Sequence, residues 1–153
     1  MAATKPYPRD IPPLWLVLAL LTMVALNCFC PIAVFIGKPE KYVGFVGIGA
    51  SIVLMVTSAR RFQRVGTGIR PFTSAKALVE LGAYRFTRNP MYVGLMGSTL
   101  GTAVCLGSVS TLLVPPVLFF VLDRRFVRRE EAFLREHFGT AYEDYCGRVR
   151  RWL

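Results

Sequence analysis

The sequence predicts an all-α integral membrane protein with four membrane-spanning helices in a single domain, residues 1–153. Three observations lead to this fold class. Hydrophobic residues make up 54% of the chain and lie in long unbroken runs, as expected of helices that cross a bilayer. The chain is also basic, with 19 Lys and Arg against 9 Asp and Glu. If each apolar run crosses the membrane, nearly all of these basic residues lie on the same side of it.

The first half of the chain contains two apolar runs. The first, residues 11–36, has no charged residue and exceeds the ~20 apolar residues that cross the hydrocarbon core. Its length, without a small-x-small cleavage site, argues against a signal peptide, and Pro31 is expected to kink its far end. "GKPEKY" predicts a turn. The second run, 43–59, has small residues that permit close helix packing.

Two shorter apolar runs follow a basic polar connection. They cover residues 91–106 and 109–122, and only Gly107-Ser108 separates them. We therefore expect a tight helical hairpin, in which each helix is short for a span. The remaining tail, 123–153, is charged and amphipathic.

The distribution of basic residues predicts the topology. With four spans, the N-terminus, the central connection and the tail share one side of the membrane. These segments hold seventeen of the 19 basic residues, and only Lys38 and Lys41 remain for the other side. The positive-inside rule therefore predicts that both ends are cytoplasmic.

Several functional classes are disfavoured by the sequence. A nucleic-acid-binding protein fits poorly, because no basic stretch alternates with apolar positions as in a compact reader. The four Cys are too scattered for a disulfide framework, and no His/Cys cluster has metal-ligand spacing, so no metal is predicted. No acidic residue lies within a predicted span, which argues against a proton-coupled transporter.

The stretch "GAYRFTRNPMYVG", residues 82–94, is the first candidate for chemistry. Asn89 is a suitable N-cap and Pro90 a suitable first residue for the third helix. The free N–H groups of that helix start would favour an anion beside them. Two Tyr and two Arg surround it: Tyr84, Arg85, Arg88 and Tyr92. Anchoring at the membrane interface is the alternative explanation for these residue types.

The tail provides the second candidate. Read as a helix, it has one face made of Phe126, Glu130, Phe133, Leu134 and His137. Glu130 is thus an acid on an apolar face and needs a partner. That partner is either an Arg of the central connection or a ligand. Glu131, on a wetter face, is expected to pair with Arg135. Gly139 should end this helix, and a second apolar stripe follows: Tyr142, Tyr145, Val149 and Trp152.

Together, "GAYRFTRNPMYVG" and "EEAFLREHFGTAYEDYCGRV" about 40 residues later resemble the superfamily of isoprenylcysteine carboxyl methyltransferases and phospholipid methyltransferases. The resemblance covers residues 76–153, with the order and spacing of the family pattern. It implies membrane helices without a Rossmann fold and methyl transfer from S-adenosylmethionine to a lipidic acceptor in the membrane.

The resemblance also implies site residues. The cofactor would be bound by ten residues: Lys76, Ala77, Leu78, Val79, Tyr84, Asn89, Pro90, Met91, Tyr92 and Glu130. Of these, Glu130, Tyr92 and Asn89 would be catalytic. Catalysis would consist mainly of positioning and desolvation.

The sequence departs from the family pattern at two places. Isoprenylcysteine-type members have His where this chain has Asn89. They also place a substrate-binding Arg one turn before the Glu pair, where this chain has Phe126, with Arg125 adjacent and Arg129 beyond. Phe126, Arg125 and Arg129 are therefore the candidates for acceptor binding. Because the expected Arg is replaced, the departures bear on whether the protein recognises a prenylcysteine carboxylate.

Three other functions compete. An NADPH-dependent sterol or steroid reductase has a similar motif, but Met91 and Leu95 stand where its Asn and acid would be. A thiol oxidoreductase would need a second cysteine pair beside Cys28 and Cys30. An inactive family member could serve as a membrane scaffold. Binding of S-adenosylhomocysteine or NADPH would distinguish these functions.

Overall fold

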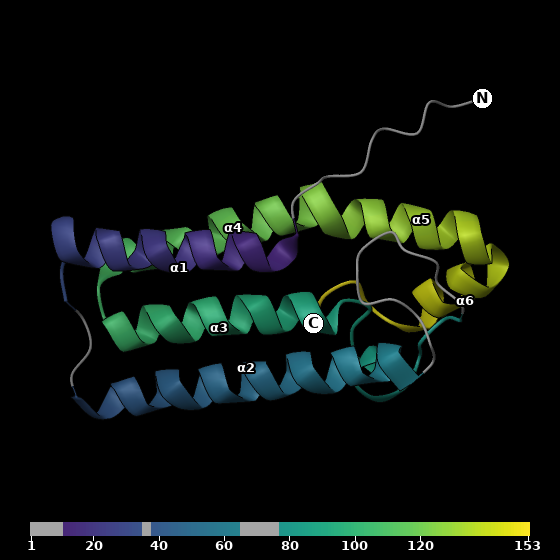
Figure 1. Ribbon diagram of the computed structural model, residues 1–153, viewed down its shortest axis with the longest axis horizontal. Coiled ribbons are helices and arrows are strands. Elements are labelled where there is room, and N and C mark those ends of the chain that lie inside the picture. The colour runs from purple at the N-terminus through teal and green to yellow at the C-terminus, as the bar shows by residue number, and fades with distance from the viewer. Residues whose placement is uncertain (1–10, 35–37, 65–76) are drawn as a thin grey trace.

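The computed structural model describes residues 11–34, 38–64 and 77–153, and within these ranges the chain is helical without β-strands. Of the six α-helices in the described residues, the first four run side by side and the last two extend from one end of this bundle (Figure 1). Two isolated bridges connect distant segments, Val34 with Ser108 and Thr87 with Arg150. The predicted all-α class is therefore confirmed for the described residues.

The first two helices are α1, Pro12–Phe29, and α2, Lys38–Arg64. Both α1 and most of α2 are long and apolar enough to cross a membrane. The predicted first run was too long, because α1 ends at Phe29. Pro31 disfavours a helical conformation at the residue that precedes it, Cys30. The predicted turn at "GKPEKY" was also wrong. From Lys38 this segment forms the start of α2, where the first turn tolerates Pro39.

Helix α3, Pro90–Leu106, is followed by a tight turn. Gly107 adopts a φ of +70° there, which suits glycine. The chain then forms η2, a 3₁₀ helix over Val109–Leu113, and α4, Val114–Leu122. The predicted turn between the last two runs is confirmed, whereas the fourth run is only partly α-helical.

The tail continues α4 with little change of direction. A π-helical turn, η3 over Asp123–Val127, joins α4 to α5, Arg128–Phe138. Gly139, at a φ of +54°, ends α5 as predicted, and α6 spans Thr140–Arg148. A π turn holds more residues per turn than an α-helix, so it changes which side chains of α5 face inward.

Helix α3 lies at the centre of the bundle and contacts α1, α2 and α4. The core lies between α1, α3, α4 and η3, and includes Met23, Ala103, Leu122 and Phe126, all fully buried. Many large apolar side chains of α1 and α2 instead point outward, among them Leu21 and Val46. Such extensive apolar surface is expected where lipid rather than water surrounds the helix, and it supports membrane association.

Glycines allow α2 and α3 to lie very close together. A Cβ atom on Gly101 of α3 would lie 2.8 Å from the carbonyl oxygen of Gly44 and 2.8 Å from Cγ1 of Ile48. On Gly94 it would lie 2.9 Å from the carbonyl oxygen of Ser51. Because two of these atoms belong to backbone, the helices would have to separate to admit a methyl group.

Gly101→Ala is therefore expected to destabilise the protein by about 1–2 kcal/mol, since overpacking outweighs the gain in helix propensity. Thermal unfolding in detergent micelles measures the change. Gly49→Ala in α2 is the matched control, because nothing lies within 4 Å of its added Cβ. A Gly101 variant as stable as the Gly49 variant would contradict the close approach.

Candidate active site

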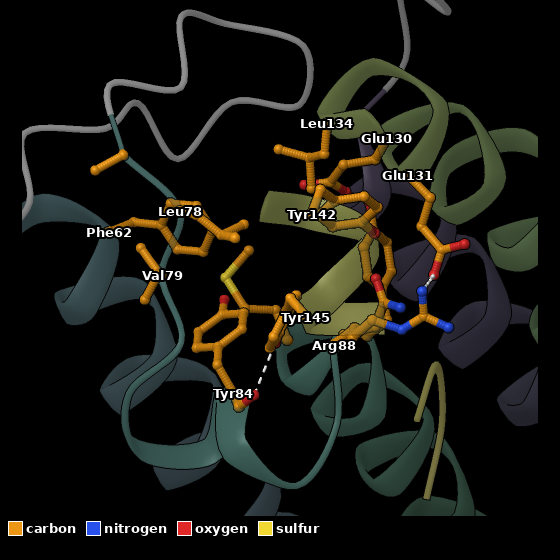
Figure 2. A pocket seen from close by; sticks show the side chains of 14 residues that line it. Phe62, Leu78, Val79, Tyr84, Arg88, Glu130, Glu131, Leu134, Tyr142 and Tyr145 are labelled. Atoms are coloured by element: carbon orange, nitrogen blue, oxygen red, sulfur yellow. Dashed lines mark hydrogen bonds and ion pairs between the residues drawn. The ribbon is translucent and has the colours of Figure 1, made fainter. Parts of the chain in front are cut away.

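A cavity lies where the bundle meets α5 and α6, between the end of α2, the segment before α3 and the tail helices. The empty space of this cavity, part of which is open to solvent, measures about 580 Å³. Figure 2 shows Phe62, Leu78 and Val79 on one side, opposite Glu130 and Tyr142. Its lining residues are Phe62, Ala77, Leu78, Val79, Tyr84, Arg88, Asn89, Met91, Tyr92, Glu130, Glu131, Leu134, Tyr142 and Tyr145.

A short 3₁₀ helix, η1 over Gly82–Arg85, places Tyr84 in this wall. The Tyr145 hydroxyl donates a hydrogen bond to the backbone carbonyl of Tyr84 at 2.7 Å, which ties α6 to the segment before α3 (Figure 2). Burial raises the pKa of both phenols above the ordinary value, so both stay neutral at physiological pH. The site therefore has a rigid, uncharged aromatic side.

Glu131 lies between two arginines. Its Oε2 accepts hydrogen bonds from Nε and Nη2 of Arg151 at 2.9 and 2.6 Å, and its Oε1 lies 3.4 Å from Nη1 of Arg88. Only 4% of the Glu131 side chain is exposed. The predicted pairing of Glu131 with Arg135 was wrong. Arg135 instead lies 3.9 Å from Glu143, and the Glu131 side chain is turned toward Arg88 and Arg151.

Glu130 occupies a different environment. The Tyr92 hydroxyl donates a hydrogen bond to Oε2 of Glu130 at 3.1 Å. Burial raises the pKa of Glu130 above its ordinary 4.5, the Tyr92 hydrogen bond lowers it, and the Glu131 charge raises it further. No ion pair to Glu130 occurs among the described contacts. The predicted acid on an apolar face is thus held by a tyrosine rather than by an arginine of the central connection.

A second, larger and mostly apolar cavity adjoins the first. It has an empty volume of about 1000 Å³ and is lined by Ile11, Pro12, Pro13, Met55, Val56, Ala59, Met91, Tyr92, Leu95 and Glu130. These residues come from the start of α1, from α2, from α3 and from α5. Met91, Tyr92 and Glu130 line both cavities, so the two spaces meet at the Tyr92–Glu130 hydrogen bond.

The structure brings together eight of the predicted cofactor residues on the wall of the first cavity: Ala77, Leu78, Val79, Tyr84, Asn89, Met91, Tyr92 and Glu130. Lys76 lies outside the described residues, and Pro90 is buried at the start of α3. Asn89 is the residue before the helix, as predicted, but its side chain makes no capping hydrogen bond. Its Nδ2 donates instead to the carbonyl of Arg151 at 3.0 Å.

The predicted acceptor-binding residues do not line either cavity. Phe126 is fully buried in the core. Arg125 lies over the ring of Trp15 at 5.6 Å, and Arg129 is partly buried. Their predicted role in acceptor binding stays a prediction.

Several lining residues were not among those predicted for the site. Glu131, Tyr142 and Tyr145 were assigned to a wetter helix face or to an interfacial stripe, and Phe62 was not considered. A signal was available for three of them, because Glu131, Tyr142 and Tyr145 all lie in the stretch "EEAFLREHFGTAYEDYCGRV" that resembles the family. Phe62 carried no such signal.

Comparison with known proteins identifies the family. The phospholipid methyltransferase family pattern matches residues 40–141, about two thirds of the chain, and the protein belongs to this family. The chain is 36% identical over 109 residues to the protein-S-isoprenylcysteine O-methyltransferase of Schizosaccharomyces pombe, covering 69% of this chain and 45% of that protein. It is 35% identical over 125 residues to a probable protein-S-isoprenylcysteine O-methyltransferase of Oryza sativa subsp. indica, covering 76% and 63%.

The chain thus spans less than two thirds of the length of these relatives. A shorter relative, an uncharacterized protein of Haemophilus influenzae, is 33% identical over 63 residues, which is its whole length. The predicted superfamily is confirmed. The methyltransferase names of the first two relatives favour this class over the NADPH-dependent reductase.

Proposed function

We propose that the protein is an integral membrane methyltransferase that transfers a methyl group from S-adenosylmethionine to a lipidic acceptor. We further propose four spans, with both ends and the active site on the cytoplasmic side. The helix directions support this topology, because α1 and α3 begin, and α2 and α4 end, at the end of the bundle that carries α5 and α6 (Figure 1). Most of the basic residues in the part of the chain that the structure describes lie at that end.

The observation that carries the proposal is the meeting of two unlike cavities at Tyr92 and Glu130. The first has polar groups and adjoins the tail helices, as expected for a water-soluble methyl donor. The second cavity is mostly apolar and lies between the ends of α1, α2 and α3, as expected for the hydrocarbon chain of an acceptor that enters from the bilayer. A reaction between a soluble donor and a lipidic acceptor needs such a shared boundary.

The residues of the first cavity fit the donor. Nε of Arg88 is buried there without a hydrogen-bond partner among the described residues, and Oε1 of Glu131 is buried with only the ion pair to Nη1 of Arg88 at 3.4 Å. Buried polar atoms without hydrogen-bond partners are energetically costly. These two atoms are therefore suited to a ligand that supplies both a hydrogen-bond acceptor and a hydrogen-bond donor. S-adenosylmethionine does so, through its carboxylate, ammonium and ribose hydroxyls.

The residues at the boundary between the two cavities suggest how the protein would assist methyl transfer. When bound, S-adenosylmethionine supplies a methyl carbon that bonds to the acceptor's nucleophile while the carbon–sulfur bond breaks and its electron pair stays on sulfur. Glu130 would hold ammonium or hydroxyl groups of the donor, and the Tyr92 hydroxyl would orient the Glu130 carboxylate. The apolar side chains of Met91 and Leu95 would exclude water from the approach of the acceptor.

The acceptor is proposed from the second cavity and from the relatives. Its lining, apart from Glu130, is apolar or aromatic, so it suits a hydrocarbon chain that carries the nucleophile at one end. The names of the relatives specify isoprenylcysteine as their acceptor, and we propose an acceptor of this lipid-modified kind.

Isothermal titration of the detergent-solubilised protein with S-adenosylhomocysteine and with NADPH tests the proposal. We expect micromolar binding of S-adenosylhomocysteine and its loss in Glu130→Ala and Tyr92→Ala. Circular dichroism of both variants should show the helical content of the unmodified protein. Binding of NADPH without binding of S-adenosylhomocysteine would overturn the proposal.

The raised pKa of Glu130 predicts how binding depends on pH. The hydrogen-bond donors of the ligand prefer the ionised carboxylate of Glu130. The affinity for S-adenosylhomocysteine should therefore be highest at alkaline pH and should fall as Glu130 takes up a proton. Because the pKa is raised, this fall should begin at a higher pH than for an ordinary glutamate and approach tenfold per pH unit.

Titrations between pH 5 and 8 measure this dependence. In Glu130→Gln the remaining affinity should vary little over the same range. His137→Gln is the control for the single histidine, whose side chain is exposed, and it should keep the pH dependence of the unmodified protein. An affinity that rises toward acid pH would contradict the assignment of Glu130.

A further inference from the structure

The last residues of the chain lie against the segment that begins α3. The N–H of Arg88 donates to the carbonyl of Arg150 at 2.9 Å. The Thr87 hydroxyl and the Asn89 amide both donate to the carbonyl of Arg151, at 3.1 and 3.0 Å. Three consecutive residues of the segment before α3 are thus bonded to two consecutive carbonyls more than 60 residues away.

The side chain of Arg151 makes a second connection, to α5. It binds Oε2 of Glu131 through two nitrogens, Nε and Nη2, at 2.9 and 2.6 Å. The hydrogen bonds to Glu131 raise the pKa of Arg151 further, so its charge is permanent. Two nitrogens of the planar guanidinium converge on one carboxylate oxygen, which fixes the position of that oxygen more closely than a single hydrogen bond would. One residue therefore holds Asn89 through its backbone and Glu131 through its side chain.

The neighbouring residue anchors this arrangement to the bundle. The Trp152 ring lies 4.9 Å from the ring of Phe119 in α4 and packs against the core. The Arg151 side chain is 37% exposed and is not among the residues that line either cavity. Any effect of Arg151 on a ligand must therefore pass through the residues that it holds.

We propose that Arg151 is a positioning residue for the candidate active site, which it aligns by holding Asn89 and Glu131 at once. This inference rests on the proposed function, because the ligand is the methyl donor. Its consequence is that donor affinity depends on a side chain outside the cavity. The guanidinium fork is required, since a lysine at this position keeps the charge but offers a single ammonium group.

The test compares Arg151→Gln, Arg151→Lys and a control, Arg148→Gln, by titration with S-adenosylhomocysteine. Arg148 also contacts a carboxylate, Glu80, at 2.9 Å, but this pair lies at the surface. We expect Arg151→Gln to weaken binding about tenfold or more. Arg151→Lys should recover only part of this loss, and Arg148→Gln should bind within about twofold of the unmodified protein.

A double-mutant cycle separates positioning from general loss of stability. If Arg151 acts through Glu131, then the Glu131→Gln/Arg151→Gln pair should bind little worse than Glu131→Gln alone. Additive losses in the cycle, or equal losses in Arg151→Gln and Arg148→Gln, would overturn the inference while leaving the proposed function intact. Failure of the unmodified protein to bind S-adenosylhomocysteine would overturn both.

Discussion

Replacing Glu130 with glutamine is expected to weaken S-adenosylhomocysteine binding by about 10–150-fold, the range for losing a hydrogen bond to a charged group. The change keeps the size of the side chain and leaves an oxygen that can accept from the Tyr92 hydroxyl. The loss therefore reports the charge of Glu130 rather than a cavity or an unpaired phenol.

The same change should not destabilise the ligand-free protein at neutral pH. The pKa of Glu130 is raised in the folded state, so its contribution to stability is fully present below the unfolded pKa and is lost as pH rises through the folded pKa. Above that pH the ionised side chain opposes folding, and glutamine removes the opposition. Weaker ligand binding together with equal or greater stability would identify Glu130 as a functional rather than a structural residue.

Titration calorimetry and thermal unfolding of the same preparations provide both measurements. Glu136→Gln is the matched control, because Glu136 is an exposed residue of the same helix and does not line either cavity. It should change neither quantity. Unchanged affinity in Glu130→Gln would remove Glu130 from the proposed site.

Glu131→Ala is expected to produce the largest loss of stability, about 3 kcal/mol. Removing this carboxylate leaves the guanidinium groups of Arg88 and Arg151 without their shared counter-charge, and unpaired buried charges typically cost 3–5 kcal/mol. The lower end applies because Arg151 is 37% exposed, although the Arg88 side chain is only 13% exposed. Thermal unfolding in detergent should show the midpoint falling by several degrees.

The control for this prediction is a surface ion pair on the same helices. Glu143 lies 3.9 Å from Arg135, and both side chains are more than half exposed. Glu143→Ala should therefore change stability by less than about 1 kcal/mol. Similar effects of the two substitutions would show that Glu131 is not held as the structure describes.

The adjacent residues Glu130 and Glu131 illustrate the limit of sequence-based prediction, because the environment of only one of them was predicted correctly. Helical periodicity correctly indicated an acid on an inward face, but it assigned the wrong environment to Glu131. The π turn at Asp123–Val127 adds residues to one helical turn and thereby alters the facing of everything after it. A uniform period of 3.6 residues does not reveal such a turn.

Asn89 shows a different limit. Its place before Pro90 follows from the local preferences of a helix start, and α3 begins there as predicted. The partner of its side chain does not follow, because an asparagine amide can donate to any carbonyl that the fold brings near. That carbonyl belongs to Arg151, 62 residues later.

The sequence by itself determined the helical class, the apolar runs, the basic segments and the two motifs of the family. These are properties of neighbouring residues, and hydropathy or local backbone preference is sufficient to establish them. Only the tertiary structure decided that Glu130 meets Tyr92, that Glu131 lies between Arg88 and Arg151, and that two cavities share one boundary. Those features join residues 20 to more than 60 positions apart, and they depend on helix register and packing that no local pattern encodes.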